Sequence, residues 1–198
     1  MRRKTKKESL GAVLNFISEA GMLKRVERSG WSVLGIKNSE SVADHSFRCV
    51  VIGYLLAQLE KISVYKVLLM TLFNDLQEAR ITDLHKMAQR YFDVQSAEEK
   101  AFYEQINVLP KKIKGELLDL HQEYKQQKSR ESIVARDADI LECLIQAKEY
   151  SEHGFSEAVK FMEKAPRFLK TKSAQGLWKL AKNVKLSDWW INLSPFKR

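Results

Sequence analysis

The sequence predicts an all-α fold, a single compact helical bundle of about eight helices. Only three prolines and eight glycines interrupt the 198 residues, which favours long helices over a turn-rich β fold. Apolar residues recur at spacings of three and four in nearly every segment, as on the buried face of a helix. With 44% hydrophobic and 30% charged residues, the chain can bury a sizeable core, and we expect one domain spanning residues 1–198.

The first half contains two predicted helices separated by a long connection. A helix is expected over residues 9–20, where the apolar positions share one face and a glycine follows. Residues 21–40 show no sustained period, and long connections in compact domains are often functional. Ser41 and Asp44 form a capping box that opens a helix over residues 42–59. The residues of this helix expected to face inward are Phe47, Val50, Val51, Tyr54 and Leu55.

The second half contains the longest predicted helices. Ser63 can cap an apolar helix over residues 64–79, and capping signals at Ser96 and Pro110 open two more. A longer helix is expected over residues 131–153 because Gly154 follows it. Two further helices are expected near the carboxyl end, over residues 156–164 and 172–184.

The net charge of +9 is concentrated at the two ends of the chain. Residues 1–7 carry five Lys or Arg and no acid, and residues 160–198 carry ten Lys or Arg against two acids. Residues 8–159 therefore have a net charge of about −4. We interpret residues 1–8 as a flexible basic tail and residues 156–198 as basic terminal helices. Nucleic acid is not an expected partner, because the central body is mildly acidic.

No stretch reaches the roughly 18 apolar residues of a membrane span, and the basic start lacks the apolar core of a secretory signal. The sequence therefore predicts a cytoplasmic protein with no membrane partner. The two cysteines, Cys49 and Cys143, lie inside apolar helical patterns. We interpret both as buried small hydrophobic residues in a reducing compartment.

Polar residues interrupt the apolar helices at three places: Asp44-His45, the stretch "FNDLQEARITD" at 73–83, and Asp137 with Asp139. A charged or polar group buried without a partner is costly, so these clusters predict either helix ends or a site. Histidine, carboxylate and amide ligands suit divalent ions such as Mn, Co, Zn, Fe or Mg. Spacing alone leaves simpler interpretations open: His45 as a structural hydrogen-bonding residue, and Asp83 as the cap of a helix beginning at Leu84.

Four ordered blocks of the sequence resemble the HD-domain metal-dependent phosphohydrolases, and among them the HD-type 5'-deoxynucleotidases. The blocks are "LKRVERSGW", "ESVADHSF", "FNDLQEARITD" and "RDADILECLIQAKEY", and they span residues 22–150. The resemblance implies an all-α HD fold, a divalent metal ion, and release of phosphate from nucleoside 5'-monophosphates, including deoxynucleotides. It also implies a homodimer.

The resemblance assigns the metal ligands residue by residue. His45 stands at the first ligand position, and Asp75 at the Asp of the family's His-Asp pair. Asn74 occupies the position of the His of that pair, so an amide replaces an imidazole. Asp139 is the best match for the distal ligand, and Asp137 is the alternative.

The resemblance also assigns the substrate-handling residues. Glu78 matches an acid that positions or activates the attacking water, and Asp83 an acid associated with the sugar. Arg28 matches an Arg that contacts the phosphate, and Trp31 a neighbouring pocket aromatic. Thr82 stands where the family has Gly, so the turn before Asp83 lacks the usual conformational freedom.

Two alternative functions follow from the departures and from the ends of the chain. The substitution at Asn74 is compatible with a degenerate HD protein that binds a nucleotide without catalysis. The basic ends and the pair Trp189-Trp190 are compatible with a helical interaction or nucleic-acid-binding protein that keeps only the scaffold. Tryptophan pairs near a terminus are more often packed across the body or a dimer seam.

Overall fold

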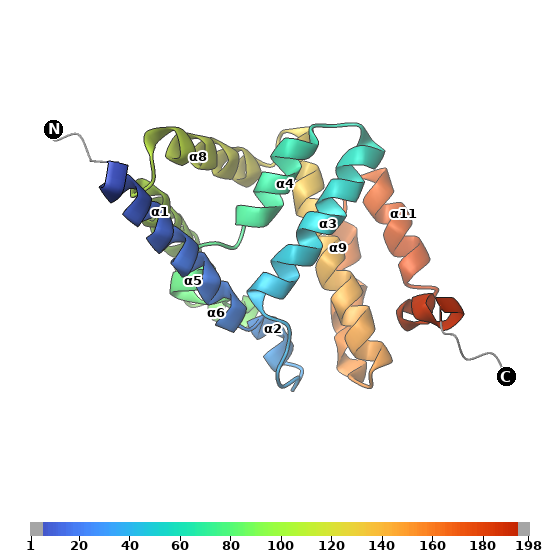
Figure 1. Cartoon of the computed structure of the whole chain (residues 1–198). Helices are drawn as coiled ribbons and strands as arrows, with labels where there is room; N and C mark the ends of the chain where they lie inside the picture. The colour runs from blue at the N-terminus through green and yellow to red at the C-terminus, as the bar shows by residue number, and fades with distance from the viewer. Residues whose placement is uncertain (1–5, 194–198) are drawn as a thin grey trace.

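The computed structural model describes residues 6–193, and within that range the chain is built from helices and turns (Figure 1). The prediction of an all-α fold is confirmed. The described residues form eleven α-helices and four 3-10 helices, and four of the α-helices have six residues or fewer. The elements are α1 (Lys6–Ala20), η1 (Gly21–Arg25), α2 (Ser29–Ser32), α3 (Val42–Glu60), α4 (Val64–Phe73), α5 (Glu78–Ile81), α6 (Lys86–Gln89), α7 (Val94–Asn107), α8 (Lys111–Gln126), α9 (Arg130–Glu152), η2 (Ser156–Ala158), α10 (Val159–Lys164), η3 (Ala165–Phe168), α11 (Lys172–Ala181) and η4 (Leu186–Leu193).

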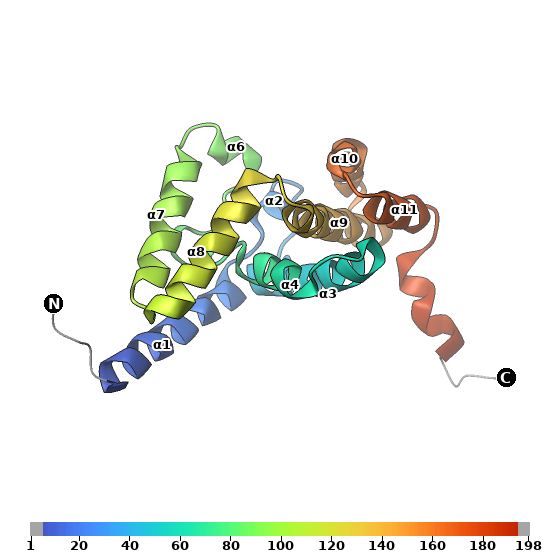
Figure 2. The same cartoon turned by 90° about the horizontal axis from the view of Figure 1, so that it is seen from above.

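Three helices, α3, α4 and α9, form the centre of the molecule. In the view of Figure 2, α1, α7 and α8 lie on one side of this group, and α10 and α11 lie on the other. The shared core contains Leu56, Val67, Leu141 and Leu144, all nearly inaccessible to solvent. Helices α3 and α4 approach closely at Gly53, where an added Cβ would lie 3.1 Å from a Thr71 methyl carbon. Glycine at this position therefore allows the tight packing on which the centre depends.

Several predicted boundaries are confirmed and others are wrong. The capping box at Ser41 and Asp44 opens α3 as expected, and the longest helix, α9, lies within one residue of its prediction. The predicted helix 64–79 instead ends at Phe73, and turns at 74–77 separate it from α5. Helix α7 begins at Val94, because Asp93 accepts a hydrogen bond from the Ser96 backbone N–H and caps it earlier than expected.

Helix α1 begins at Lys6, three residues earlier than expected, and the flexible basic tail over residues 1–8 stays a prediction. Residues 1–5 lie outside the described part of the chain. At the other end, η4 leaves the side chains of Trp189 and Trp190 74% and 52% exposed. Packing of this tryptophan pair across the body is therefore not observed. No helix in the range 6–193 combines the length and apolarity needed to cross a membrane.

The buried face of α3 differs from the one expected. Phe47, Val51, Tyr54 and Leu55 are exposed, with Phe47 73% accessible. The face packed toward α4 and α9 instead consists of His45, Cys49, Ile52 and Leu56. The reason is that α3 carries apolar residues around most of its circumference, so periodicity alone does not select the inner face.

Thr82 is the most strained described residue near the polar cluster. Its φ of 63° and ψ of 167° fall in a region that is essentially restricted to glycine. The family's glycine at this position would adopt it without a Cβ clash. The strain persists because Asp83, the next residue, is held by a hydrogen bond from the Ser29 backbone N–H.

We expect Thr82→Gly to raise the free energy of unfolding by about 1 kcal/mol, since the relieved backbone strain exceeds the entropy that glycine adds to the unfolded chain. The melting temperature should rise by roughly 2–4 °C for a chain of this length. Calorimetry measures the change. Thr82→Ala is the matched control, because it keeps the Cβ and should give no comparable gain; equal stabilisation by both substitutions would contradict the strain argument.

Candidate active site

The site is organised around His45, which is fully buried on the first turn of α3. Its Nδ1 makes a short hydrogen bond with a Glu142 carboxylate oxygen, and Glu142 is also inaccessible to solvent. The Arg48 guanidinium lies 2.9 Å from the other oxygen of Glu142 and also binds Glu149 on α9. A carboxylate on one imidazole nitrogen fixes the ring orientation and directs the other nitrogen outward, as in metal sites. His45 Nε2 is therefore the nitrogen available to a ligand.

Two carboxylates face this nitrogen from other parts of the chain. Asp139 Oδ1, on α9, lies 3.1 Å from His45 Nε2, and Asp75 Oδ2, in the turn after α4, lies 3.5 Å from it. Burial raises the pKa of Asp75. Burial acts in the same direction on Asp139, but the hydrogen bond from His45 and the charge of Arg136 outweigh it and hold that pKa below its usual range. The structure thus brings together three of the four predicted metal ligands.

Asn74, the fourth predicted ligand, turns its amide toward its neighbour. Its Nδ2 donates a hydrogen bond of 2.7 Å to Asp75 Oδ1. The contact leaves Asp75 Oδ2 as the carboxylate oxygen that faces His45. In this arrangement Asn74 orients Asp75, and its assignment as a ligand stays a prediction.

The alternative distal ligand, Asp137, has a structural role. Asp137 is buried, with 1% of the residue exposed. Its carboxylate accepts hydrogen bonds from the backbone N–H groups of Lys170 and Thr171. It also accepts one from the Thr171 hydroxyl at 2.7 Å. Asp137 therefore anchors the start of α11 to α9, and the geometry favours Asp139 as the ligand.

Arg28 immediately precedes α2, and Asp83 binds the first residue of that helix. The Asp83 Oδ2 atom accepts a 2.7 Å hydrogen bond from the Ser29 backbone N–H, which fastens the loop carrying Arg28 to the segment after α5. Arg28 Nη1 lies 3.9 Å from Asp75 Oδ2. Burial alone would lower the pKa of Arg28, but the negative charges of Asp75 and Asp83 raise it, so the guanidinium stays charged.

The alternative role of Asp83, as cap of a helix beginning at Leu84, is not observed. Helix α6 begins at Lys86, and its cap is His85, whose Nδ1 accepts a hydrogen bond from the Ala88 backbone N–H. The carboxylate of Asp83 is thus used for the loop at Ser29.

Glu78 opens α5 beside these carboxylates and is 9% exposed. Burial and the negative charges of Asp75 and Asp83 raise the pKa of Glu78 to about 10. Its Oε2 is buried and has no hydrogen-bond partner among the described residues. A buried carboxyl oxygen without a partner is costly, so it points to a ligand or water that completes the site.

Trp31 lines the site but is 2% exposed. Its ring packs against Phe161 and Tyr150, with centroid distances of 4.8 and 5.1 Å. Its Nε1 donates a 2.9 Å hydrogen bond to Glu40, whose pKa is raised to about 7 by burial and by the charge of Glu142. Trp31 therefore supports the wall of the site, and its contact with a substrate stays a prediction.

A cavity of about 670 Å³ opens onto these groups. This size lies within the range of small-molecule sites. Lys125 and Arg136 line it together with the predicted residues, and the predicted residues on its wall are Arg28, Trp31, Asn74, Asp75, Glu78, Asp83 and Asp139. His45 lies behind the lining, in contact with Asp75 and Asp139.

The donor set fits a divalent cation. One imidazole nitrogen with its tautomer fixed by a carboxylate, two further carboxylates and an unpartnered carboxyl oxygen are N and O ligands of the type that such ions prefer. Burial raises the pKa values of Asp75 and Glu78, so their charged forms are unfavourable there, and a bound cation would offset that cost.

The sequence patterns missed Glu142, which contacts His45, and Arg48, which binds Glu142. Arg48 lies one turn after His45 on α3, and Glu142 lies three residues after Asp139 on α9. The apolar spacing of these helices does not indicate a functional role at either position. A charged residue in the middle of a buried helical face was the available signal for Glu142, which lies among Leu141, Leu144 and Ala138.

Comparison with known proteins decides the family. The HD domain family model matches residues 20–178. The chain belongs to the HD-domain family. The predicted resemblance to HD-type phosphohydrolases, and with it the prediction of a hydrolase, is thereby confirmed.

Named relatives and solved structures agree with this HD-domain assignment. The 5'-deoxynucleotidase HDDC2 of Xenopus laevis is 31% identical over 142 residues, which cover 71% of this chain and 70% of that protein. The protein of the same name from Dictyostelium discoideum is 32% identical over 148 residues, covering 70% and 77%. A conserved protein of Pyrococcus furiosus superposes with a TM-score of 0.71 at 34% identity, covering 86% of this chain and 97% of that one.

We expect Glu142→Gln to weaken the binding of a divalent metal about 10–100-fold, because the neutral amide no longer fixes the His45 ring as the carboxylate does. Titration calorimetry with zinc or manganese measures the affinity. Glu149→Gln is the matched control, since Glu149 also binds Arg48 but does not contact His45. Equal losses in the two variants would show that the effect runs through Arg48 rather than the imidazole.

Proposed function

We propose that this HD-domain chain releases phosphate from deoxynucleoside 5'-monophosphates, with His45, Asp75 and Asp139 as ligands of a divalent metal ion. The observation that carries the proposal is the convergence on His45 Nε2 of two carboxylates from separate elements, at 3.1 and 3.5 Å, beside a nucleotide-sized cavity. The relatives named as 5'-deoxynucleotidases support the substrate class.

Arg28 is suited to the phosphate. It is the charged guanidinium at the cavity wall closest to Asp75, and a planar fork can bind two phosphate oxygens at once. The hydrogen bond between Asp83 and the Ser29 backbone fixes the loop from which Arg28 projects. Lys125 and Arg136 add positive charge to the same cavity and favour an anionic substrate.

A metal ion bound by these residues would polarise a phosphoryl oxygen and lower the pKa of a bound water. Glu78 is placed beside Asp75 to orient the attacking water and to accept its proton. Its carboxyl holds a proton at neutral pH when Asp75 and Asp83 are both charged beside it. Positive charge next to those carboxylates offsets their effect and brings the pKa of Glu78 down toward the working range.

We expect purified protein supplied with a divalent metal to release inorganic phosphate from deoxynucleoside 5'-monophosphates. Glu78→Gln should lower kcat about 10²–10⁴-fold, the usual contribution of a positioned proton-transfer group. Asp75→Ala should abolish the metal-dependent activity. Asp119 is an exposed acid on α8, so Asp119→Ala is the control and should leave both kcat and the metal dependence unchanged. A colorimetric phosphate assay across deoxy- and ribonucleotides tests this. If no nucleotide releases phosphate in a metal-dependent way, the proposal is wrong.

The same proposal includes a homodimer, formed through the exposed apolar face of α3. Phe47, Val51, Tyr54 and Leu55 lie along one side of this helix and are 43–73% exposed. Continuous apolar surface of this kind on a folded protein marks an interaction site. A second copy of the chain offers the same face and could cover it symmetrically.

Phe47→Glu should convert a dimer into a monomer, because it introduces paired like charges into an apolar interface. Light scattering after size-exclusion chromatography measures the mass. Phe92→Glu is the matched control, since Phe92 is 65% exposed but lies before α7, outside the α3 face. A wild-type protein that runs as a monomer at micromolar concentration would rule out this interface.

A further inference from the structure

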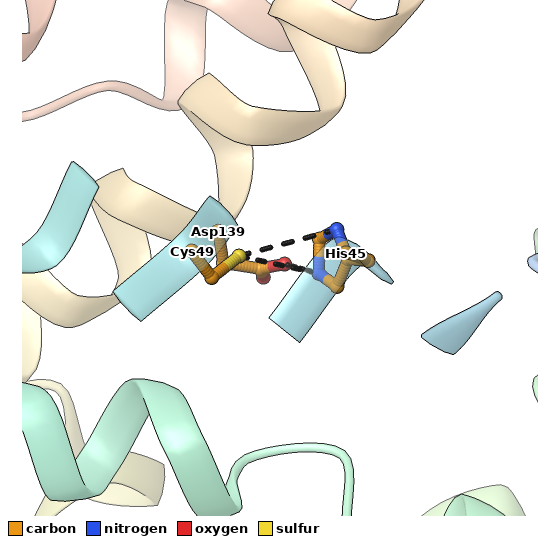
Figure 3. A group of neighbouring side chains, drawn as sticks. All are labelled: His45, Cys49 and Asp139. Carbon is orange, nitrogen blue, oxygen red and sulfur yellow. Dashed lines mark hydrogen bonds and ion pairs between the residues drawn. The ribbon is translucent and has the colours of Figure 1, made fainter. Parts of the chain in front are cut away.

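The thiol of Cys49 lies next to His45 Nε2, as Asp75 and Asp139 do, but it has no role in the proposed metal site. Cys49 lies one turn after His45 on α3, and its Sγ is 3.4 Å from Nε2 (Figure 3). Cys49 is buried, with 3% of the residue exposed. In the described residues, one of the two compact groups of potential metal ligands, with all ligand atoms within 4.8 Å, consists of His45, Cys49 and Asp139. The sequence patterns assigned Cys49 only to the core.

We propose that Cys49 is a metal ligand of this centre, supplying a thiolate where the family's second imidazole is replaced by Asn74. The proposal rests on the metal centre of the proposed function and adds a ligand to it.

The distances support this assignment. Metal bonds of about 2.0–2.3 Å to N, O and S, at tetrahedral or octahedral angles, place neighbouring ligand atoms roughly 2.9–3.6 Å apart. Around His45 Nε2, the observed separations are 3.1 Å to Asp139 Oδ1 and 3.4 Å to Cys49 Sγ. The two other contacts of this thiol are longer, 3.9 Å to His45 Nδ1 and 4.0 Å to the Ala138 carbonyl oxygen. The two separations from His45 Nε2 fall within the range expected for neighbouring ligand atoms.

The position of Cys49 also suits a catalytic centre. Asp75 and Asp139 line the cavity, whereas His45 and Cys49 lie on the core side of them. Ligands from the core side leave the cavity side open to water and substrate, as catalytic metal sites require. Helix α3 delivers both groups, because residues four apart lie on one helical face.

A thiolate changes the expected metal. An amide at position 74 alone would favour harder ions such as Mg²⁺ and Mn²⁺, whereas a sulfur ligand favours Zn²⁺ and Co²⁺. The thiol must lose its proton to solvent when the ion binds, so binding releases a proton and tightens as the pH rises.

Cobalt substitution tests the ligand directly, without substrate. The full-length protein, stripped of metal and kept reduced under anaerobic conditions, is titrated with Co²⁺ while the near-ultraviolet thiolate-to-cobalt charge-transfer band is followed. We expect the band in the wild type and its loss in Cys49→Ser. Cys143→Ser is the matched control, because Cys143 lines the cavity on α9 but lies outside the compact group. It should keep the band.

Zinc and manganese affinities give a second measurement. Cys49→Ser should weaken zinc binding about tenfold or more and manganese binding by less. Cys49→Ala repeats the test if the serine variant loses its helical circular dichroism. Cobalt bound at one ion per chain without the band, or with a band that persists in Cys49→Ser, overturns the thiolate ligand and leaves the phosphohydrolase centre intact. Failure of the wild type to bind cobalt, zinc or manganese overturns both.

Discussion

The site depends on one buried interaction, the hydrogen bond between His45 on α3 and Glu142 on α9. Both side chains are inaccessible to solvent, and a carboxylate buried in this way is tolerable only because Arg48 and the imidazole satisfy its oxygens. The pair fixes the relative position of α3 and α9, the two longest helices of the described chain. It also fixes which imidazole nitrogen faces Asp75 and Asp139. The same contact therefore sets both the packing at the centre and the chemistry beside it.

The break after α4 supplies the second constraint. A continuous helix over residues 64–79 would keep its polar end on the axis of α4, whereas the turns at 74–77 redirect the chain. Asp75 then reaches His45 and Glu78 begins α5 at the cavity wall. Burial, together with the negative charges of Asp75 and Asp83, raises the pKa of Glu78 in this cluster. Such perturbed groups gather where a function requires them.

Much of the architecture follows from local sequence signals, and the errors share a physical cause. The capping box of α3 and the long periodic run of α9 depend on neighbours in the chain, so the sequence predicts both. No local signal places His45, Asp75 and Asp139 together; the resemblance of the motif blocks to the HD-domain family predicts it. The inner face of α3 could not be predicted, because its apolar residues surround the helix and the choice depends on α4 and α9. Glu142 and Cys49 acquire their roles only through contacts with His45 across space or along a helical face.

The two departures from the family pattern have different consequences in this structure. Asn74 is accommodated without strain, because its amide donates to Asp75 and leaves the second carboxylate oxygen toward His45. The substitution removes an imidazole nitrogen as a metal ligand. We propose that the sulfur of Cys49, 3.4 Å from His45 Nε2, takes its place as a soft ligand. Thr82 is different, because its backbone is held in a conformation suited to glycine. Asp83 can bind the Ser29 backbone, and so hold the loop of Arg28, only if this turn is kept. The chain thus retains the shape of the turn at a cost in strain, which indicates that the position of Arg28 relative to Asp75 is the property the site preserves.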